Sequence, residues 1–503
     1  MIKDYFKDLI LHHFGHKPTQ DQEKVIDSLC QFILTPDADS VFILRGFAGT
    51  GKTSLVSALV KTMEQLDREC VLMAPTGRAA KVFSLYADHP AFTIHKRIYR
   101  QKSIDKDSIF TLNYNMRQNL LFICDEASMI ANDEYLSGSL YGTGRLLDDL
   151  VHFVYGGKGC RLILMGDTAQ LPPVGDVESP ALSDEYMNGY GLQVISHTLT
   201  QVVRQAEESG ILWNATHLRQ ALNCQLSTVN CQLPQIQFKG FPDVKNIPGN
   251  ELIEALEDCY HRDGEDETIV VTRSNKRANL YNNGIRAQIL WREEPLEGGD
   301  ILMVAKNNYY WTEKLALELL ANAKAEGKTP EEAETVPFDF IANGDTAIIR
   351  RIRNERNFYG FTFADATLEF PDYDGFTLEA TVMLDTLQSE APALTKEQQD
   401  NLYNRIMEDY NGDPTLRSKQ DKLKALRQDP YYNALQIKYA YAITCHKAQG
   451  GQWTNVFIDQ GYMTEELLSP DYFRWLYTAI TRATQRVFFV NWPKEQVMEK
   501  LEE

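Results

Sequence analysis

The sequence predicts an α/β protein with two lobes, each built on a parallel β-sheet, and three observations lead to this prediction. Short apolar runs that end at a polar motif are typical of buried parallel strands, and they occur in two separate groups. The length of 503 residues exceeds what one ordinary core holds, so two to four domains are expected. Within the second group, the pattern changes to the alternation of antiparallel strands.

The first group of apolar runs predicts the sheet of the first lobe, and the second group predicts the sheet of the second lobe. Several of these runs lead towards helical sequence, which is the order expected of α/β units. The first-lobe runs are 41–44, 70–74, 120–124 and 162–165, and the second-lobe runs are 268–271, 455–458 and 486–490.

An insertion interrupts the second lobe. From about residue 300 to 387 apolar and polar residues alternate, with turn residues at Asn343-Gly344 and Asp374-Gly375, which predicts a small antiparallel barrel. The charged stretch 396–427 has helical spacing, and the sequence assigns it no task. We therefore expect a first lobe over 1–200, a second lobe in two parts over 201–299 and 434–503, and the barrel with the helical segment over 300–433.

Composition bounds the class of protein. The chain is 43% hydrophobic and 24% charged, and it contains neither a long uncharged apolar run nor a signal-peptide pattern, so a cytoplasmic protein without membrane contact is expected. Its eight cysteines lack CxxC or zinc spacing, and we expect reduced thiols. The net charge of -19 argues against a protein that coats nucleic acid, but it permits a local basic groove on an otherwise acidic surface.

Residues 46–53 fit the phosphate-binding pattern GxxxxGK[ST], and they follow a predicted strand and open a predicted helix. Backbone N–H groups would wrap the phosphates, Lys52 would neutralise the β and γ phosphates, and the Thr53 hydroxyl would bind Mg²⁺. The alternative is a glycine-rich turn that matches by chance. The predicted ATP-binding residues here are Gly46, Ala48, Gly49, Thr50, Gly51, Lys52, Thr53 and Ser54.

Two carboxylates, Asp125 and Glu126, end the run 120–124. At the carboxyl edge of a parallel sheet they would lie beside the phosphate loop. Asp125 would hold the Mg²⁺ shell, and Glu126 would act as the general base that aligns and deprotonates the attacking water. Alone, such a pair is more often part of a solvated loop, and only its combination with the phosphate loop makes it a strong signal.

A third strand ends in 166–174, where Gln170 could hydrogen-bond the γ phosphate and report hydrolysis. The alternative interpretation is a loop that ends at prolines. The predicted cofactors are thus ATP and Mg²⁺, whichever reaction the chain drives.

The order of these elements resembles the superfamily-one helicases, in particular the RecD-like and Dda-like branch that includes Pif-type enzymes. The likeness spans nearly the whole chain and implies two RecA-like P-loop lobes, with a Src-homology-type β-barrel inserted in the second. It also implies that Gln22, in 18–22, reads the adenine edge. Gly450, in the motif over 442–452, is assigned to the nucleotide cleft.

The resemblance supplies two arginines for the γ phosphate. Arg204 lies in 199–205 and Arg482 in 477–483, and both segments are similar to family motifs that carry such residues. Each would stabilise charge on the transferring phosphoryl group with a planar donor fork that lysine cannot reproduce. Arg482 carries the closer motif match.

The same resemblance implies contacts with a DNA single strand. In relatives the segments like 74–80 and 93–95 contact the strand, which assigns Pro75, Thr76, Thr93 and His95; Thr444 and His446 follow from the motif over 442–452. Small hydroxylated residues at strand ends can approach a phosphate backbone closely. Plain helix caps, turns and a structural histidine are the alternatives.

Residues of about 97–117 form a connection longer than the fold needs, and they resemble the short hairpin, or pin, with which the branch splits duplex. Together with the barrel, this implies 5′ to 3′ movement on single-stranded DNA and unwinding of tailed duplex, with roles in DNA repair and recombination. We expect a monomer, with partner subunits possible. An RNA or RNA–DNA hybrid helicase, and a non-unwinding ATP-gated nucleic-acid binding module, remain the alternatives.

Overall fold

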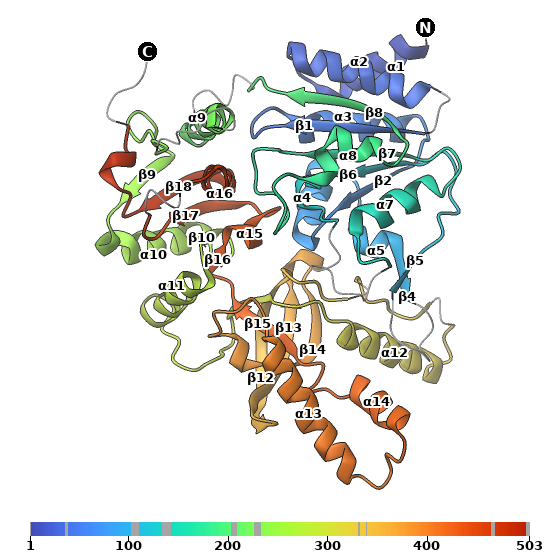
Figure 1. Ribbon diagram of the computed structural model, residues 1–503, viewed down its shortest axis with the longest axis vertical. Helices are drawn as coiled ribbons and strands as arrows, with labels where there is room; N and C mark the ends of the chain where they lie inside the picture. The colour runs from blue at the N-terminus through green and yellow to red at the C-terminus, as the bar shows by residue number, and fades with distance from the viewer. Residues whose placement is uncertain are drawn as a thin grey trace. The chain divides into compact units, whose positions relative to one another are not determined.

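The structure is a computed structural model that describes residues 2–35, 39–101, 110–132, 142–202, 209–225, 233–329, 332–338, 340–463 and 468–498. The chain divides into two compact units (Figure 1). The first comprises Met1–Ile247, Ala448–Val456 and Tyr462–Glu503, and the second comprises Pro248–Lys447 and Phe457–Gly461.

The first sheet is parallel throughout and has the strand order β3-β2-β6-β7-β1-β8. Four of its strands coincide with the apolar runs predicted for the first lobe. The bounds are β1 Ser40–Gly46, β2 Cys70–Ala74, β3 Ala91–Thr93, β6 Leu121–Cys124, β7 Arg161–Gly166 and β8 Gln193–Leu199. Because all strands run the same way, the segments that follow them meet at one edge of the sheet.

Helices cover this sheet and share its core. Phe6 and Ile10 of α1, Leu29 of α2 and Leu59 of α3 belong to one buried cluster with strand residues such as Ile163. The helices of this part are α1 Ile2–Phe14, α2 Gln20–Leu34, α3 Lys52–Gln65, α4 Gly77–Ala87, α5 Ile94–Ile98, α7 Leu146–Tyr155 and α8 Asp184–Asn188.

An antiparallel hairpin lies where the pin is predicted. Strand β4 (Tyr99–Gln101) pairs with β5 (Phe110–Leu112), and the residues between them are outside the described part of the chain. The hydroxyl of Tyr99, the first residue of β4, donates to the buried Asp149 of α7 at 2.7 Å, which fastens the base of the hairpin to the first lobe.

The second sheet has the order β16-β10-β17-β18-β9, and β10 with β16 and β18 with β9 pair in parallel. Its strands are β9 Val244–Ile247, β10 Thr268–Thr272, β16 Ala442–Thr444, β17 Trp453–Asp459 and β18 Ala483–Val490. The associated helices are α9 Gly210–Gln225, α10 Leu252–Asp263, α11 Asn275–Gln288, α15 Cys445–Ala448 and α16 Pro470–Ile480.

The insertion is a closed five-stranded barrel, as the alternating pattern predicted. Its strands are β11 Ile301–Val304, β12 Thr346–Phe358, β13 Phe361–Phe370, β14 Phe376–Met383 and β15 Leu435–Tyr439, with α12 Tyr310–Ala325 between the first two. Parallel pairing of β14 with β15 completes the barrel, and the other pairs are antiparallel. The predicted fold class, two parallel-sheet lobes with a hairpin and a barrel insertion, is confirmed.

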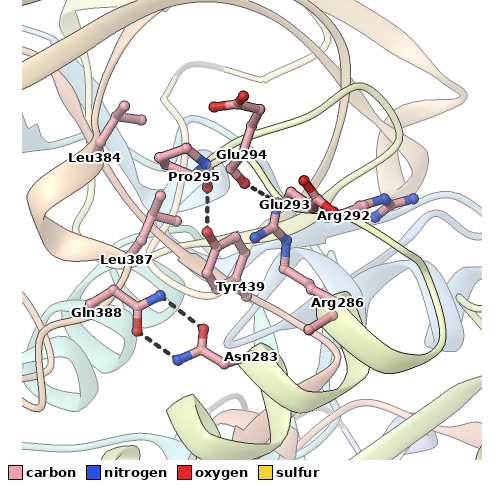
Figure 2. Close-up of a pocket in the computed structure, with 11 residues that line it drawn as sticks. Asn283, Arg286, Arg292, Glu293, Glu294, Pro295, Leu384, Leu387, Gln388 and Tyr439 are labelled. Atoms are coloured by element: carbon pink, nitrogen blue, oxygen red, sulfur yellow. Dashed lines mark hydrogen bonds between the residues drawn. The ribbon is translucent and has the colours of Figure 1, made fainter.

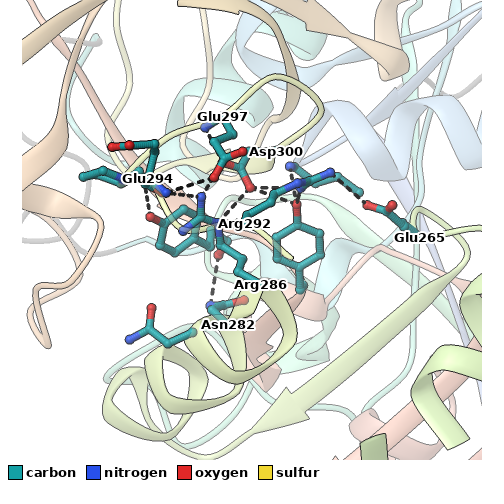
Figure 3. A network of polar contacts seen from close by, with 12 residues as sticks. Glu265, Asn282, Arg286, Arg292, Glu294, Glu297 and Asp300 are labelled. Atoms are coloured by element: carbon teal, nitrogen blue, oxygen red, sulfur yellow. Dashed lines mark hydrogen bonds and ion pairs between the residues drawn. The ribbon is translucent and has the colours of Figure 1, made fainter. Parts of the chain in front are cut away.

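The barrel is joined to α11 at its root by a buried network that Figure 3 shows. Asp300, fully buried just before β11, accepts two hydrogen bonds from the Arg286 guanidinium of α11, at 2.9 and 3.0 Å, and one from Arg292 at 2.9 Å. The Tyr441 hydroxyl, beyond β15, lies 3.1 Å from the same carboxylate. The network therefore ties together the points where the chain enters and leaves the barrel.

The helical segment 396–427 folds as α13 (Lys396–Gly412) and α14 (Lys419–Arg427), which lie beside the barrel (Figure 1). A buried cluster joins Leu402 and Ile406 of α13 and Leu426 of α14 to Phe361 and Phe363 of β13. This segment is thus an extension of the barrel wall with a small core of its own. Short 3-10 turns cover Ala127–Met129, Pro180–Leu182, Gly249–Glu251, Pro371–Tyr373, Leu384–Thr386 and Lys494–Gln496.

Candidate nucleotide and nucleic-acid site

The phosphate loop lies between β1 and α3, in the context the motif requires. A Cβ on Gly46 would come within 2.7 Å of the Lys52 side chain, and Gly51 takes a φ of +79° at the N-cap of α3, so both positions need glycine. Lys52 Nζ donates to the carbonyl oxygens of Gly46 and Phe47. The ammonium group is thereby held inside the loop, with the N-terminus of α3 beside it, which is an arrangement suited to an anion.

Gln22, predicted to read adenine, has another role in the described contacts. Its side chain Nε2 donates to the Thr50 carbonyl at 2.9 Å, and its Oε1 accepts from the Thr19 N–H at 2.9 Å. Thr19 returns a hydrogen bond, so that the two residues form a capping box at the start of α2. Gln22 is therefore buried as a brace between α2 and the phosphate loop, and one amide N–H is left for any base contact.

The carboxylates Asp125 and Glu126 follow β6, which pairs with β7, and β7 pairs in turn with β1. Burial, together with the neighbouring charge of Glu126, raises the pKa of Asp125, while Lys52 opposes this rise. Glu126 takes a φ of +50°, unusual for a residue with a side chain, and its N–H donates to Asp125 Oδ1 at 2.8 Å. A partly buried carboxylate whose charged form is disfavoured can be stabilised by binding a divalent cation.

The donors present fit Mg²⁺ bound together with a nucleotide. Thr53, in the first turn of α3, and Asp125 supply hard oxygen atoms at the same sheet edge. No group of three His, Cys, Asp or Glu that could hold a metal occurs in the described ranges. Mg²⁺ commonly takes only one or two protein ligands beside phosphates and water, so the two donors suffice.

The third strand end, after β7, is built around Asp167 and Gln170. Asp167 is buried and accepts hydrogen bonds from the Ala169 N–H at 2.9 Å and from the Tyr477 hydroxyl at 2.6 Å. Gln170 is also buried, and its Oε1 is among the described buried atoms that have no hydrogen-bond partner. Because a side-chain amide can accept through oxygen and donate through nitrogen, Gln170 offers an unsatisfied amide end for a phosphate or a water.

Arg482 reaches the same edge from the end of α16. Its guanidinium lies 3.9 Å from the Glu126 carboxylate and donates to the carbonyls of Thr478 and Gly451 at 3.2 Å each. The predicted general base and the predicted arginine finger are therefore brought together although they are far apart in the sequence. Arg204, the second predicted finger, lies outside the described residues.

Several residues at this site were not singled out from the sequence. The Tyr477 hydroxyl of α16 donates to Asp167, and the Thr478 hydroxyl accepts from the Leu171 N–H. Gln449 Nε2 donates to the Leu171 carbonyl at 2.6 Å. Tyr477 and Thr478 lie in the motif over 477–483, and Gln449 lies in the motif over 442–452. Their polar residues inside otherwise buried segments were the available signal.

Of the residues predicted to contact DNA, Thr76 and Thr93 lie at the ends of two paired strands. Thr76 is the N-cap of α4 and accepts from the Ala79 N–H, and Thr93 is the N-cap of α5 and accepts from the Lys96 N–H, both at 3.2 Å. Parallel pairing of β2 with β3 sets Thr93 opposite Ala74, close in sequence to Thr76. A hydroxyl that caps a helix in this way still has its own proton to donate, so capping and phosphate contact are compatible.

Histidines and Gly450 complete the predicted set. Burial lowers the pKa of His95 to about 4, so this ring is neutral near pH 7 and cannot add charge to a strand contact. In the second unit Thr444 ends β16, and the exposed His446 follows in α15. A Cβ on Gly450 would come within 2.9 Å of Ala79, which shows that Gly450 packs against α4.

A pocket of about 370 Å³ lies elsewhere, in the second unit between α11 and the barrel root (Figure 2). Leu384, Leu387 and Tyr439 line it, and the amides of Asn283 and Gln388 close one side by two mutual hydrogen bonds. None of the predicted site residues lines this pocket. Arg286 and Arg292 of its lining belong to the Asp300 network.

Two regions of the chain match known protein families. Residues 19–223 match a family model described as an AAA domain, and residues 439–490 match the UvrD-like helicase C-terminal domain. The chain is 24% identical to the uncharacterized protein R530 of Acanthamoeba polyphaga mimivirus, over 93% of this chain and 99% of that protein. No described helix is long and apolar enough to cross a membrane.

Relatives whose names state an activity include two ATP-dependent DNA helicases. Over 39% of this chain the identity is 30% to the ATP-dependent RecD2 DNA helicase of Deinococcus radiodurans, and over 32% it is 28% to the ATP-dependent DNA helicase PIF6 of Trypanosoma brucei brucei. The chain covers only 23% and 20% of their lengths, respectively. Among solved structures, a Pif1 helicase from Bacteroides in complex with ADP-AlF3 and single-stranded DNA is 16% identical with a TM-score of 0.43, over 96% of this chain and 95% of that one.

Proposed function

We propose that this chain translocates along single-stranded DNA and unwinds duplex DNA with energy from ATP hydrolysis. The two family matches and the helicase relatives support a superfamily-one helicase of the Pif-type branch. The observation that carries the proposal is the meeting of the phosphate loop, the carboxylate pair and an arginine at one sheet edge. Arg482 lies 3.9 Å from Glu126 there, and Lys52 is held in the loop between β1 and α3.

The proposed hydrolysis assigns each group a part. The phosphate loop and Lys52 bind the β and γ phosphates, Glu126 aligns and deprotonates the attacking water, and Arg482 neutralises charge as the γ phosphoryl group transfers. Gln170 would contact the γ phosphate or the water through its unsatisfied amide. Mg²⁺, held by Thr53 and Asp125, would neutralise charge on the phosphate oxygens. Arg204 is proposed as a second finger from its motif alone.

The contact with nucleic acid is proposed to run along the ends of β2 and β3. Pro75, Thr76, Thr93 and His95 lie there. Thr444 and His446 are proposed as further strand contacts from their motif alone. Helix N-termini at Thr76 and Thr93 offer N–H groups and a positive dipole end to phosphates without a large basic surface. This explains how a chain with a net charge of -19 can still hold a strand.

Duplex separation is assigned to the β4–β5 hairpin, and the direction of movement is proposed to be 5′ to 3′. A wedge must separate base pairs against about 1.4 kcal/mol of stacking per step, so its base has to be held firmly. The hydrogen bond from Tyr99 to Asp149 holds the base of this hairpin. DNA is the proposed substrate because the relatives with named activities are DNA helicases. The proposed working form is a monomer acting on single-stranded and tailed duplex DNA.

Tailed-duplex unwinding tests this proposal directly. Wild type is given duplex DNA with a 5′ tail, a 3′ tail or no tail, and the matched RNA and hybrid duplexes, while ATPase is measured with each strand. We expect unwinding of the 5′-tailed DNA only, and its loss in Lys52→Ala. Lys61→Ala, on the same helix α3 but beyond the loop, is the matched control and should keep activity.

Each other outcome rejects a stated part of the proposal. Preference for the 3′ tail overturns the direction, and stimulation by RNA but not DNA overturns the substrate. Strand-stimulated ATPase without any unwinding would indicate the ATP-gated binding module instead. Unwinding that survives in Lys52→Ala would remove the nucleotide site from the mechanism altogether.

A further inference from the structure

The Tyr477 hydroxyl stands between two parts of the nucleotide site. It accepts a hydrogen bond from the Ala48 N–H of the phosphate loop at 2.9 Å, and it donates to Asp167 Oδ2 at 2.6 Å. The side chain is only 1% exposed. A single buried oxygen atom thus links the loop after β1 with the loop after β7.

The direction of these two bonds is fixed by charge. Burial and the nearby Asp167 raise the pKa of Tyr477 well above its ordinary value, so the phenol keeps its proton at working pH. It must therefore donate to the carboxylate and can only accept from Ala48. Loss of the oxygen would leave both a buried N–H and a buried carboxylate short of a partner.

The Asp167 side of the link leads to Gln170. Asp167 also accepts from the Ala169 N–H, its carbonyl accepts from the Gln170 N–H, and the next residue, Leu171, donates to the Thr478 hydroxyl at 3.0 Å. Helix α16 consequently holds both ends of the short loop that presents Gln170. The Ala48 side belongs to the loop proposed to wrap the phosphates.

We propose that Tyr477 is a positioning residue that couples the phosphate loop to Gln170, so that ATP bound in the loop sets the placement of the Gln170 amide. The inference rests on the proposed ATP hydrolysis at this site. Among the described hydroxyl groups, that of Tyr477 is the one hydrogen-bonded to both Ala48 and Asp167. Movement of the loop around a phosphate is therefore transmitted through Tyr477 to Asp167, and from there to Gln170.

The test replaces Tyr477 with Phe, which keeps the ring and removes only the oxygen. We expect kcat of strand-stimulated ATP hydrolysis to fall about tenfold, the size of effect that loss of one buried hydrogen-bond link produces. The KM for ATP should stay the same or fall, since the Ala48 N–H becomes available to the nucleotide. The ratio of stimulated to basal rate should also fall, because Gln170 loses its link to the loop.

Tyr472→Phe is the matched control. Tyr472 lies on the same helix and is equally buried, and its hydroxyl accepts from Gln496 Nε2 at 3.0 Å, remote in the sequence from either nucleotide loop. A purely structural loss would lower thermal stability in both variants and scale basal and stimulated rates alike. Equal kinetic behaviour of Tyr472→Phe and Tyr477→Phe, or an unchanged kcat in Tyr477→Phe, overturns the inference.

Asp167→Asn provides the second variant, which keeps the inference testable if Tyr477→Phe is unstable. It should lower kcat in the same sense, and the double variant should be no slower than the slower single one, as expected of residues in one chain of contacts. Additive losses would overturn the link. If wild type itself shows no strand-stimulated ATPase, the proposed function fails; if it does and only these variants behave otherwise, the inference alone fails.

Discussion

Two carboxylates, the partly buried Asp125 at the nucleotide site and the fully buried Asp300 at the barrel root, have opposite surroundings. Asp300 is surrounded by two guanidinium groups, a tyrosine hydroxyl and the Glu297 N–H, so its charge and its lone pairs are satisfied (Figure 3). Asp125 accepts from the N–H of its neighbour Glu126, and burial raises its pKa. The contacts of Asp300 hold the barrel in place. The charge of Asp125 is left to be compensated by a bound cation.

This difference separates positions that keep the fold from positions that do chemistry. A satisfied buried ion pair resists removal of either partner, because the remaining charge would be stranded. A carboxylate that is buried with too little positive charge is costly to the fold and is retained where a function needs it. The same logic applies to the orphaned Gln170 amide and the positive φ of Glu126.

The largest expected effect comes from Asp125→Asn. Removal of the charge should lower ATPase activity by about a hundredfold or more. The reason is that Mg²⁺, which would neutralise charge on the phosphate oxygens, loses the Asp125 ligand. The melting temperature should stay the same or rise, since a disfavoured buried charge disappears. Steady-state ATPase and differential scanning fluorimetry measure the two quantities on the same sample.

Asp27→Asn serves as its control, because this half-exposed carboxylate pairs with Lys7 at 2.9 Å between α1 and α2. Neither its activity nor its melting temperature should change appreciably, as expected of a surface pair. A clear fall in the stability of Asp125→Asn would show that Asp125 is held as favourably as Asp300, and the contrast between the two regions would be lost.

Much of the first sheet could be predicted because its signals are local. The run 120–124 and the carboxylates after it lie within a few residues of each other, and β6 indeed ends at Cys124. Local alternation likewise predicted the antiparallel part of the barrel, but β15, which closes it by parallel pairing with β14, lies in the stretch assigned to the second lobe. The link from Ala48 through Tyr477 to Asp167 joins three segments distant in the sequence, and no local pattern contains it.

Gln22 and Asp300 illustrate the same limit. The pentapeptide around Gln22 suggested a base contact, which stays a prediction, and it gave no sign that the same amide also contacts the phosphate loop through Thr50 at 2.9 Å. Asp300 was only a flank of the insertion in the sequence, and its two arginines lie on the chain before it. A charge that is buried and compensated leaves no pattern in hydropathy, so its importance emerges only from packing.

A smaller effect, on stability and not on chemistry, is expected of Asp300→Ala. Arg286 is 6% exposed and would lose its partner, which typically costs about 3–5 kcal/mol of unfolding free energy. Glu369→Ala is the matched control, since its paired Arg350 is half exposed and its loss should cost about 1 kcal/mol or less. Urea unfolding followed by circular dichroism compares them, and equal losses would remove Asp300 from its assigned role.

The smallest effect should come from Asp345, a buried carboxylate of the barrel that lacks the guanidinium partners of Asp300. Burial raises its pKa to about 7, while the Ala342 N–H donates to it at 2.7 Å. Between the unfolded pKa near 3.8 and this value the folded chain holds a proton that the unfolded chain has lost, so stability falls as pH rises through that window.

Asp345→Asn should therefore flatten the decline in melting temperature between about pH 4 and 7, because the amide does not titrate. Asp365→Asn, in the same barrel, is the control: the hydrogen bond from Arg356 lowers the pKa of Asp365, so its titration lies below this window and the slope should stay that of wild type. If Asp345→Asn keeps the wild-type slope while Asp365→Asn flattens it, compensation by a guanidinium is not what distinguishes the buried carboxylates of this molecule.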